Sequence, residues 1–139
     1  MEGFKTDFLS FYYITSPGNY RYNYKVLYKV YNESKFGFLE KVYENALLIE
    51  LKLNGLNASR QIPIEVFYKG NMASNYFADI IVENKIINYI KAGENGLIAV
   101  HELQLINYLK ATEMEVGLLP SFGKRTEFKR KIFTNNNKL

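Results

Sequence analysis

The chain has 139 residues, of which 47% are apolar and 23% charged, and its formal net charge is +4. This length and composition are typical of one globular domain and argue against a wholly disordered chain. Because the sequence has no cysteine, a disulfide scaffold, a thiolate zinc site, an iron–sulfur cluster and a cysteine nucleophile are excluded. The single histidine, His101, excludes a metal site built from several histidines.

The sequence also limits the compartment and the partners. No apolar run is long enough to span a membrane, and the first 25 residues have neither the continuous apolar core nor the cleavage site of a signal peptide. We therefore expect a cytoplasmic protein with no membrane partner. The mildly basic charge is compatible with a polyanion such as nucleic acid but does not identify one.

The first predicted elements are two helices. A turn cluster, Ser16-Pro17-Gly18-Asn19, indicates that residues 1–19 are an irregular extension. Aromatic and apolar residues at helical spacing predict a helix over residues 20–31. The clearest helix lies within residues 37–57 and ends at Gly55, and its apolar stripe comprises Phe38, Leu39, Val42, Tyr43, Ala46, Leu47, Ile49 and Leu53.

The period then changes to that of strands. Residues 61–70 alternate, and residues 75–93 predict two buried strands around a loop of residues 83–85. Residues 97–112 predict another helix, followed by a strand that ends near Pro120 and a last strand over residues 126–133. This order predicts one α/β domain over residues 20–134, with helices on a central mixed sheet and a short polar tail at residues 135–139.

One acidic residue stands out, because Asp79 lies inside a predicted strand, where a buried carboxylate is costly without a partner. Alternation places Tyr89 and Lys91 on one face, and a loop of residues 83–85 puts Asp79 opposite Tyr89 on that face. An Asp and a Lys at the ends of adjacent strands form half of a metal-dependent site for phosphodiester cleavage. The simpler alternatives are a water-facing edge-strand Asp and a strand-end Lys that reaches solvent.

The other candidate residues have simpler interpretations. Glu40 suits the first turn of a helix, where its charge complements the helix dipole. His101 is interpreted as a partly buried structural histidine near the start of its helix. Four further acids are interpreted as solvated helix or turn charges: Glu44, Glu50, Glu113 and Glu115.

Residues 37–43, Gly-Phe-Leu-Glu-Lys-Val-Tyr, match a G-x-x-E-x-x-Y signature, and HELQLINYLKAT at residues 101–112 is the most specific further match. Over about residues 22–133 the chain resembles the GxxExxY family of the PD-(D/E)-x-K nuclease-like superfamily. The resemblance implies a restriction-endonuclease-like fold with a core of helix, three strands, helix and strand. It also implies nucleic acid, with DNA favoured, as the partner, and Mg²⁺ or Mn²⁺ as the cofactor of an active member.

The resemblance further implies that Glu40, Asp79 and Lys91 are active-site positions, with Glu40 and Asp79 as metal ligands. Gln104 and Tyr108 resemble the Q-x-x-x-Y motif of RecB-type nucleases, and their helical spacing puts both side chains on one face. The position two residues before the lysine, which holds an acid in the superfamily, is Tyr89 here. A neutral phenol cannot replace an anionic metal ligand.

Three interpretations of this substitution stay open. The site is impaired or inactive, or Glu40 completes the metal shell, or Glu102 reaches in from the later helix. We favour metal-dependent phosphodiester hydrolysis that is impaired or lost. The alternative is a non-catalytic pseudonuclease that binds nucleic acid or a protein partner. The sequence also leaves open whether the protein forms a homodimer.

A basic run near the C-terminus is the densest positive segment. Its residues are interpreted equally as phosphate contacts or as a solvated strand edge: Lys124, Arg125, Lys129, Arg130 and Lys131.

Overall fold

The computed structural model describes residues 20–94 and 96–138, so the expected extension over residues 1–19 lies outside the described residues. The elements in chain order are α2 (Tyr20–Ser34), α3 (Glu40–Leu53), β1 (Ala58–Tyr68), β2 (Asn71–Val82), β3 (Ile86–Asn88), β4 (Lys91–Ala92), α4 (Ala99–Lys110), β5 (Val116–Phe122), β6 (Glu127–Ile132) and the short 3₁₀ helix η1 (Asn135–Asn137). Two helices, a strand meander, a helix and two strands follow one another, which confirms the expected α/β class. No helix in the described ranges is long and apolar enough to cross a membrane.

The six strands form one mixed sheet in the order β1-β2-β3-β5-β4, and β6 also pairs with β5. The β1–β2, β2–β3 and β5–β6 pairs are antiparallel, whereas β3 and β4 run parallel to β5. Ile80 pairs with Asn88 and Val82 with Ile86, so residues 83–85 form the loop, as predicted. Continued by one residue, this register places Asp79 opposite Tyr89.

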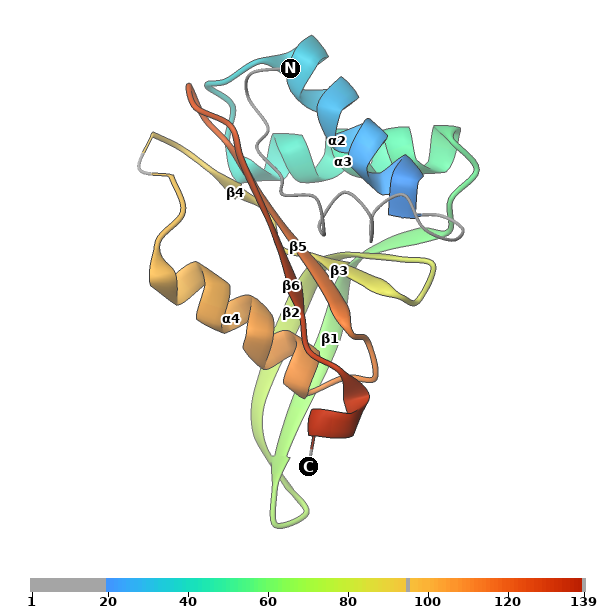
Figure 1. Cartoon of the computed structure of the whole chain (residues 1–139), viewed down its shortest axis with the longest axis vertical. Coiled ribbons are helices and arrows are strands. Elements are labelled where there is room, and N and C mark those ends of the chain that lie inside the picture. Colours follow the sequence, from blue (N-terminus) through green and yellow to red (C-terminus); the bar gives the residue numbers. More distant parts are fainter. Residues whose placement is uncertain (1–19, 95, 139) are drawn as a thin grey trace.

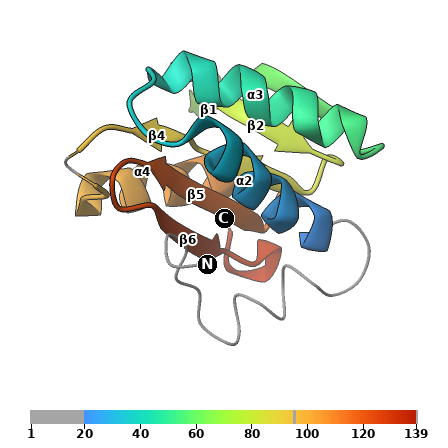
Figure 2. The same ribbon diagram turned by 90° about the horizontal axis from the view of Figure 1, so that it is seen from above.

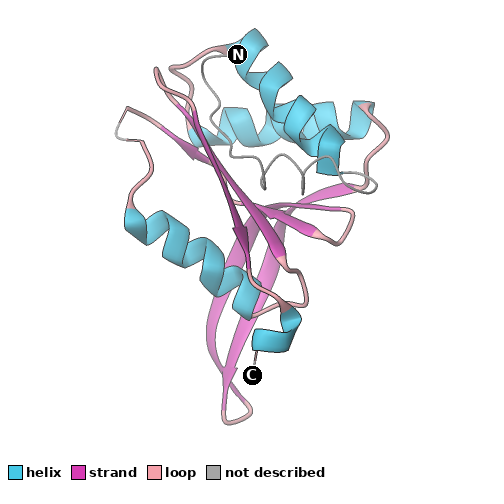
Figure 3. Ribbon diagram, in the orientation of Figure 1, coloured by secondary structure: helices cyan, strands magenta, loops and turns pink. Residues whose placement is uncertain are grey.

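The helices cover both faces of the sheet (Figures 1 and 2). Helices α2 and α3 cover one face, and α4 lies on the other against β5 and β6. A Cβ on Gly117 of β5 would lie 2.6 Å from Leu105 of α4, so only glycine permits this close approach. The β1–β2 hairpin extends well beyond the helices (Figure 3).

At Gln61 the regular alternation of side chains between the two faces of the β1–β2 hairpin is interrupted. The φ of this residue is +52°, and the ladder passes from Arg60–Ile80 directly to Ile62–Ala78. Ala58 belongs to the core beneath α2 and α3, whereas Ile64 belongs to the core beneath α4. Strict alternation would put both residues on one face. The irregularity therefore lies at the register position of Asp79.

The stripe predicted for α3 is correct only in part. Its buried apolar residues are Tyr43, Leu47 and Leu51, whereas Leu39, Val42, Ile49 and Leu53 are exposed. Glu44 was expected to be solvated, but this is wrong, because only 6% of its surface is exposed. Sequence spacing identifies an apolar helix face but does not show which part of that face meets the sheet.

The C-terminal part also differs from expectation. Strand β5 continues past Pro120 to Phe122, because β4 and β6 both pair with Ser121. The polar tail contains η1, and the Lys138 ammonium donates to the carbonyls of Thr112 and Met114, each at 2.8 Å. The tail is thus tied to the end of α4.

Candidate active site

The loop before α3 is fixed by Tyr43. Its hydroxyl donates to the Lys35 carbonyl at 2.5 Å and accepts the Phe38 N–H at 3.4 Å. The ring is fully buried and stacks on Phe122 with a centroid distance of 4.4 Å. These contacts connect the loop to β5, so they also fix Glu40 in the first turn of α3.

Glu40 meets β4 at the edge of the sheet. Its Oε1 lies 3.7 Å from Nζ of Lys91 and accepts the backbone N–H of Ala92 at 3.3 Å. Lys91 pairs in parallel with Ser121 of β5, which sets the position of the lysine. Glu40, Lys91, His101 and Ser121 line a cavity of about 210 Å³. The structure therefore brings the predicted acid of α3 and the predicted lysine together.

Asp79 of β2 contacts the segment that joins β3 to β4. Its Oδ2 accepts the Ile90 N–H at 2.7 Å. Burial raises the pKa of this carboxyl to about 6, and the negative charges of Glu44 and Glu40 add to the rise. The hydrogen bond from the Ile90 N–H and the positive charge of Lys91 both oppose it. The Asp79 carboxylate is therefore close enough to Glu40 and Lys91 for both charges to affect its pKa.

Glu44 is a further acid at this place, and sequence reasoning missed it. Gln61 donates to Oε1 of Glu44 at 3.0 Å, and the Arg60 guanidinium lies 3.8 Å from the same oxygen. Glu44 follows Glu40 by one helical turn, so both lie on the same face of α3. That spacing was the signal that could have indicated its burial near Asp79.

Tyr89 occupies the motif position of the missing acid, and its ring is held by neighbours. The ring is edge-on to Tyr108 at 5.5 Å and to His101 at 6.4 Å. Nζ of Lys91 lies 5.2 Å from the ring centroid. The lysine is thus attracted by a π face where the superfamily pattern would offer a carboxylate.

Gln104 and Tyr108 form the second part of the site. Nε2 of Gln104 donates to the Tyr108 hydroxyl at 3.1 Å, which confirms that the two share a helix face. Burial raises the pKa of Tyr108, and the Gln104 hydrogen bond opposes the rise. The pairs Glu40–Lys91 and Gln104–Tyr108 therefore meet at the ring of Tyr89.

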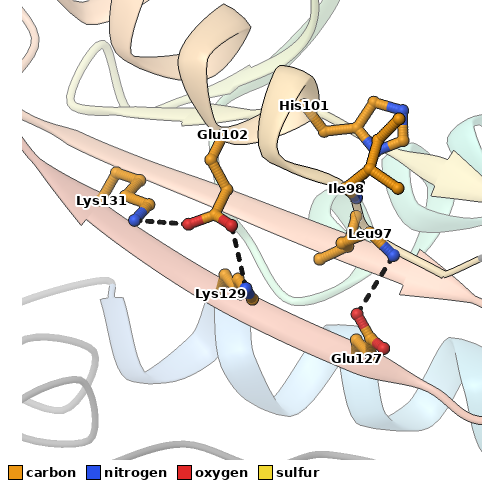
Figure 4. Close-up of polar contacts among 7 residues, drawn as sticks. All are labelled: Leu97, Ile98, His101, Glu102, Glu127, Lys129 and Lys131. Carbon is orange, nitrogen blue, oxygen red and sulfur yellow. Dashed lines mark hydrogen bonds and ion pairs between the residues drawn. The ribbon is translucent and has the colours of Figure 1, made fainter.

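His101 has the structural role expected and also faces the site. Its Nδ1 accepts the Ile98 N–H at 3.2 Å at the start of α4 (Figure 4). Burial lowers the pKa of His101, and the Lys91 charge lowers it further. A neutral imidazole whose Nδ1 accepts a hydrogen bond carries its proton on Nε2. His101 therefore adds an N–H donor to the cavity beside Glu40 and Lys91.

Glu102 is directed to β6 and away from the site. Its two oxygens bind Nζ of Lys131 at 2.6 Å and Nζ of Lys129 at 2.9 Å (Figure 4). These hydrogen bonds, that of Lys131 first, lower the pKa of Glu102. The interpretation in which Glu102 completes the metal shell is therefore wrong.

The basic run does not form one continuous surface. Lys129 and Lys131 face α4, and strand alternation directs Arg130 to the opposite face of β6. Lys124 lies in the turn before β6, with Nζ 3.9 Å from Glu94. Arg125 follows Lys124 in the same turn.

The carboxylates fit a divalent cation only weakly. Within the described ranges, no three Asp, Glu or His side chains are grouped as metal ligands. Glu40 and Asp79 each keep one oxygen that no described residue hydrogen-bonds. Mg²⁺ can bind through one or two carboxylates with water and substrate phosphate. These two residues would therefore hold the ion, which would supply Lewis-acid chemistry at a phosphate.

Comparison with known proteins identifies the superfamily of the chain. Residues 20–131 match the family described as the PD-(D/E)XK nuclease superfamily. The chain belongs to this superfamily. The crystal structure of SSO0001 is similar, with a TM-score of 0.55 and 26% identity over 68% of this chain and 50% of that one. The chain thus spans about half the length of SSO0001, and no curated protein matches.

The superfamily assignment agrees with the architecture. A six-stranded mixed sheet flanked by helices is consistent with the restriction-endonuclease-like fold of PD-(D/E)XK proteins. The chain is therefore a nuclease-like protein in fold and family. The GxxExxY family remains a resemblance, carried by Gly37, Glu40 and Tyr43.

Proposed function

We propose that this PD-(D/E)XK protein binds nucleic acid, with DNA favoured, through a nuclease-type site whose metal-dependent phosphodiester hydrolysis is weak or lost. The observation that carries the proposal is the ring of Tyr89 at the acid position, packed against Tyr108 and beneath Lys91. With one carboxylate fewer, a divalent cation is bound more weakly and its charge is less compensated.

The remaining residues have roles in holding a phosphodiester. Lys91 would neutralise charge that develops on the phosphate, and the Nε2–H of His101 would donate to a phosphate oxygen. Gln104 and Tyr108 would hold the strand from α4. Mg²⁺ or Mn²⁺ at Glu40 and Asp79 would polarise the phosphate when bound. Binding needs the cationic and polar donors, whereas cleavage also needs the ion in place.

The test compares the wild type with Tyr89→Glu and Tyr89→Gln, which have similar side-chain size and differ in charge. Mn²⁺ affinity is measured by calorimetry and nicking by a supercoiled plasmid assay. We expect little cleavage by the wild type. Tyr89→Glu should bind Mn²⁺ at least about tenfold more tightly, or ~1.4 kcal/mol. Tyr89→Gln and Tyr89→Glu combined with Asp79→Ala should show no gain.

Three results would count against the proposal or against the role that it gives to Tyr89. Robust cleavage by the wild type would show that Glu40 and Asp79 already suffice as ligands. Absence of DNA and RNA binding at low salt in EDTA would reject the binding function itself. If Tyr89→Glu is folded by circular dichroism but its Mn²⁺ affinity is unchanged, the loss of catalysis has a cause other than Tyr89.

A further inference from the structure

A second and larger hollow adjoins the candidate active site. Its volume is about 680 Å³, and it shares Glu40, Ala92 and Gly93 with the cavity around Lys91. The volume lies within the range of pockets that take drug-sized ligands. A ligand in this hollow would therefore be a neighbour of any phosphate bound at Glu40 and Lys91.

Two phenylalanine rings line this hollow and are exposed. Phe36 is 49% exposed and Phe38 50% exposed, although rings of this size are normally buried in a core. Phe38 is edge-on to the buried Tyr43 at 6.0 Å, and Nζ of Lys124 lies 5.8 Å from the centroid of Phe36. Phe38 therefore packs against a buried ring, and Phe36 lies beside a lysine at the edge of the open space.

The hollow contains stretches of bare backbone. Gly37, with φ of +110°, lies between the two phenylalanines, and Gly93 and Gly123 line another part. A Cβ on Gly123 would lie 2.5 Å from the Gly93 carbonyl oxygen, so this crossing of two chain segments excludes side chains. At Gly37 and Gly93, by contrast, a Cβ would meet nothing within 4 Å, so a flat ligand can approach the backbone closely there.

The hollow is lined by two lysines, Lys41 and Lys124, and by two glutamates, Glu40 and Glu94, so charges of both signs surround it. Lys124 has a distant partner in Glu94, and Lys41 forms no ion pair with any described residue. Flat apolar surfaces beside lysines suit a base joined to a phosphodiester, because every base has a π face and every nucleotide has a charge.

We propose that this hollow binds an unpaired nucleobase of the strand whose phosphate lies at Glu40 and Lys91, so that the substrate class is single-stranded nucleic acid or a single-stranded end. This inference rests on the proposed function. Phe36 and Phe38 supply the stacking surface, and Lys41 contacts the flanking phosphate. Bases inside a duplex are already stacked and paired, so they cannot occupy the hollow without being extruded.

The experiment measures fluorescence anisotropy of a labelled single-stranded 20-mer and of a blunt duplex of the same sequence, in EDTA. The variants are Phe36→Ala, Phe38→Ala and Phe38→Trp. The matched control is Phe77→Ala, since Phe77 is 47% exposed on β2 and does not line the hollow. We expect each alanine in the hollow to weaken single-strand binding by about 5- to 100-fold. Duplex binding should change less than twofold, Phe38→Trp should retain affinity, and Phe77→Ala should have no effect.

The outcomes separate this inference from the proposed function. Binding that prefers the duplex, or losses that are equal for Phe38→Ala and Phe77→Ala, would overturn the inference and leave nucleic-acid binding standing. Absence of binding to either probe would reject the proposed function as well. Sedimentation that finds a wild-type dimer and a Phe38→Ala monomer would identify the hollow as an interface between two copies, which would also overturn the inference.

Discussion

Asp79 accepts the backbone N–H of Ile90 at 2.7 Å, although its own register position lies opposite Tyr89. The bond holds the carboxylate at the point where the chain passes from β3 towards Lys91. It does not offset burial fully, since the pKa of Asp79 is still raised to about 6. The ionised carboxylate therefore destabilises the fold, as residues retained for a function often do.

Replacing Asp79 should make this cost measurable. Because the folded-state pKa lies above the reference value of 3.8, the folded protein holds the proton more tightly. Protonation of Asp79 therefore stabilises the fold below about pH 4, and this stabilisation is lost as the pH rises through about 6. Asp79→Asn keeps an acceptor for Ile90 without the charge, so it should raise the free energy of unfolding at pH 7 by about 1–3 kcal/mol and change it little at pH 4. Urea denaturation at both pH values tests this.

The control for that experiment is Glu94→Gln, whose side chain is 77% exposed. It should change stability by no more than about 0.5 kcal/mol at either pH. A gain from Asp79→Asn that is the same at pH 4 and pH 7 would contradict the electrostatic explanation.

Tyr43→Phe should destabilise the loop before α3. The change leaves the Lys35 carbonyl and the Phe38 N–H without their partner, whereas the stack on Phe122 remains. We expect a loss of about 1–2 kcal/mol in the free energy of unfolding. Tyr68→Phe, at a residue that is 66% exposed, is the matched control. Equal effects of the two changes in urea denaturation would show that the Tyr43 hydroxyl does not stabilise the loop.

Glu44→Gln should lower the pKa of Asp79. After burial, the charge of Glu44 is the largest influence that raises the pKa of Asp79, and a glutamine oxygen at position 44 still accepts the hydrogen bond from Gln61.

The measurement is a ¹³C NMR titration of the Asp79 side-chain carboxyl. Glu50→Gln, further along α3, is the control, because Glu50 is not among the charges that act on Asp79. An Asp79 pKa that is unchanged in Glu44→Gln would mean that the Glu44 charge does not contribute to the rise.

Glu102→Gln tests whether the β6 lysines contact phosphate. With about three to five phosphate contacts, wild-type affinity should fall by roughly one to three decades between about 50 and 200 mM salt. Glu102 neutralises part of the charge of Lys129 and Lys131. Removing its charge should therefore raise the affinity at low salt and steepen the salt dependence by about one phosphate. Glu113→Gln, at an exposed residue, is the control. An unchanged salt dependence would exclude β6 from the binding surface.

Local patterns were sufficient for most elements and for some pairs of site residues. The helix predicted over residues 97–112 is α4, and its spacing put Gln104 and Tyr108 within hydrogen-bond reach. The loop of residues 83–85 set the β2–β3 register and thus the position of Asp79 opposite Tyr89. These features depend on periods of 3.6 and 2 and on short turns, which neighbouring residues determine.

The sequence by itself thus determined the element order, the superfamily resemblance and the replacement of an acid by Tyr89. Only the tertiary structure decided that Glu44 is buried near Asp79, that Glu102 pairs with β6, and that the basic run is divided between two faces. The physical reason is that burial and charge depend on partners distant in sequence. Spacing along one helix or strand defines its faces, but the packing of α3, α4 and β6 on the sheet decides what each face meets.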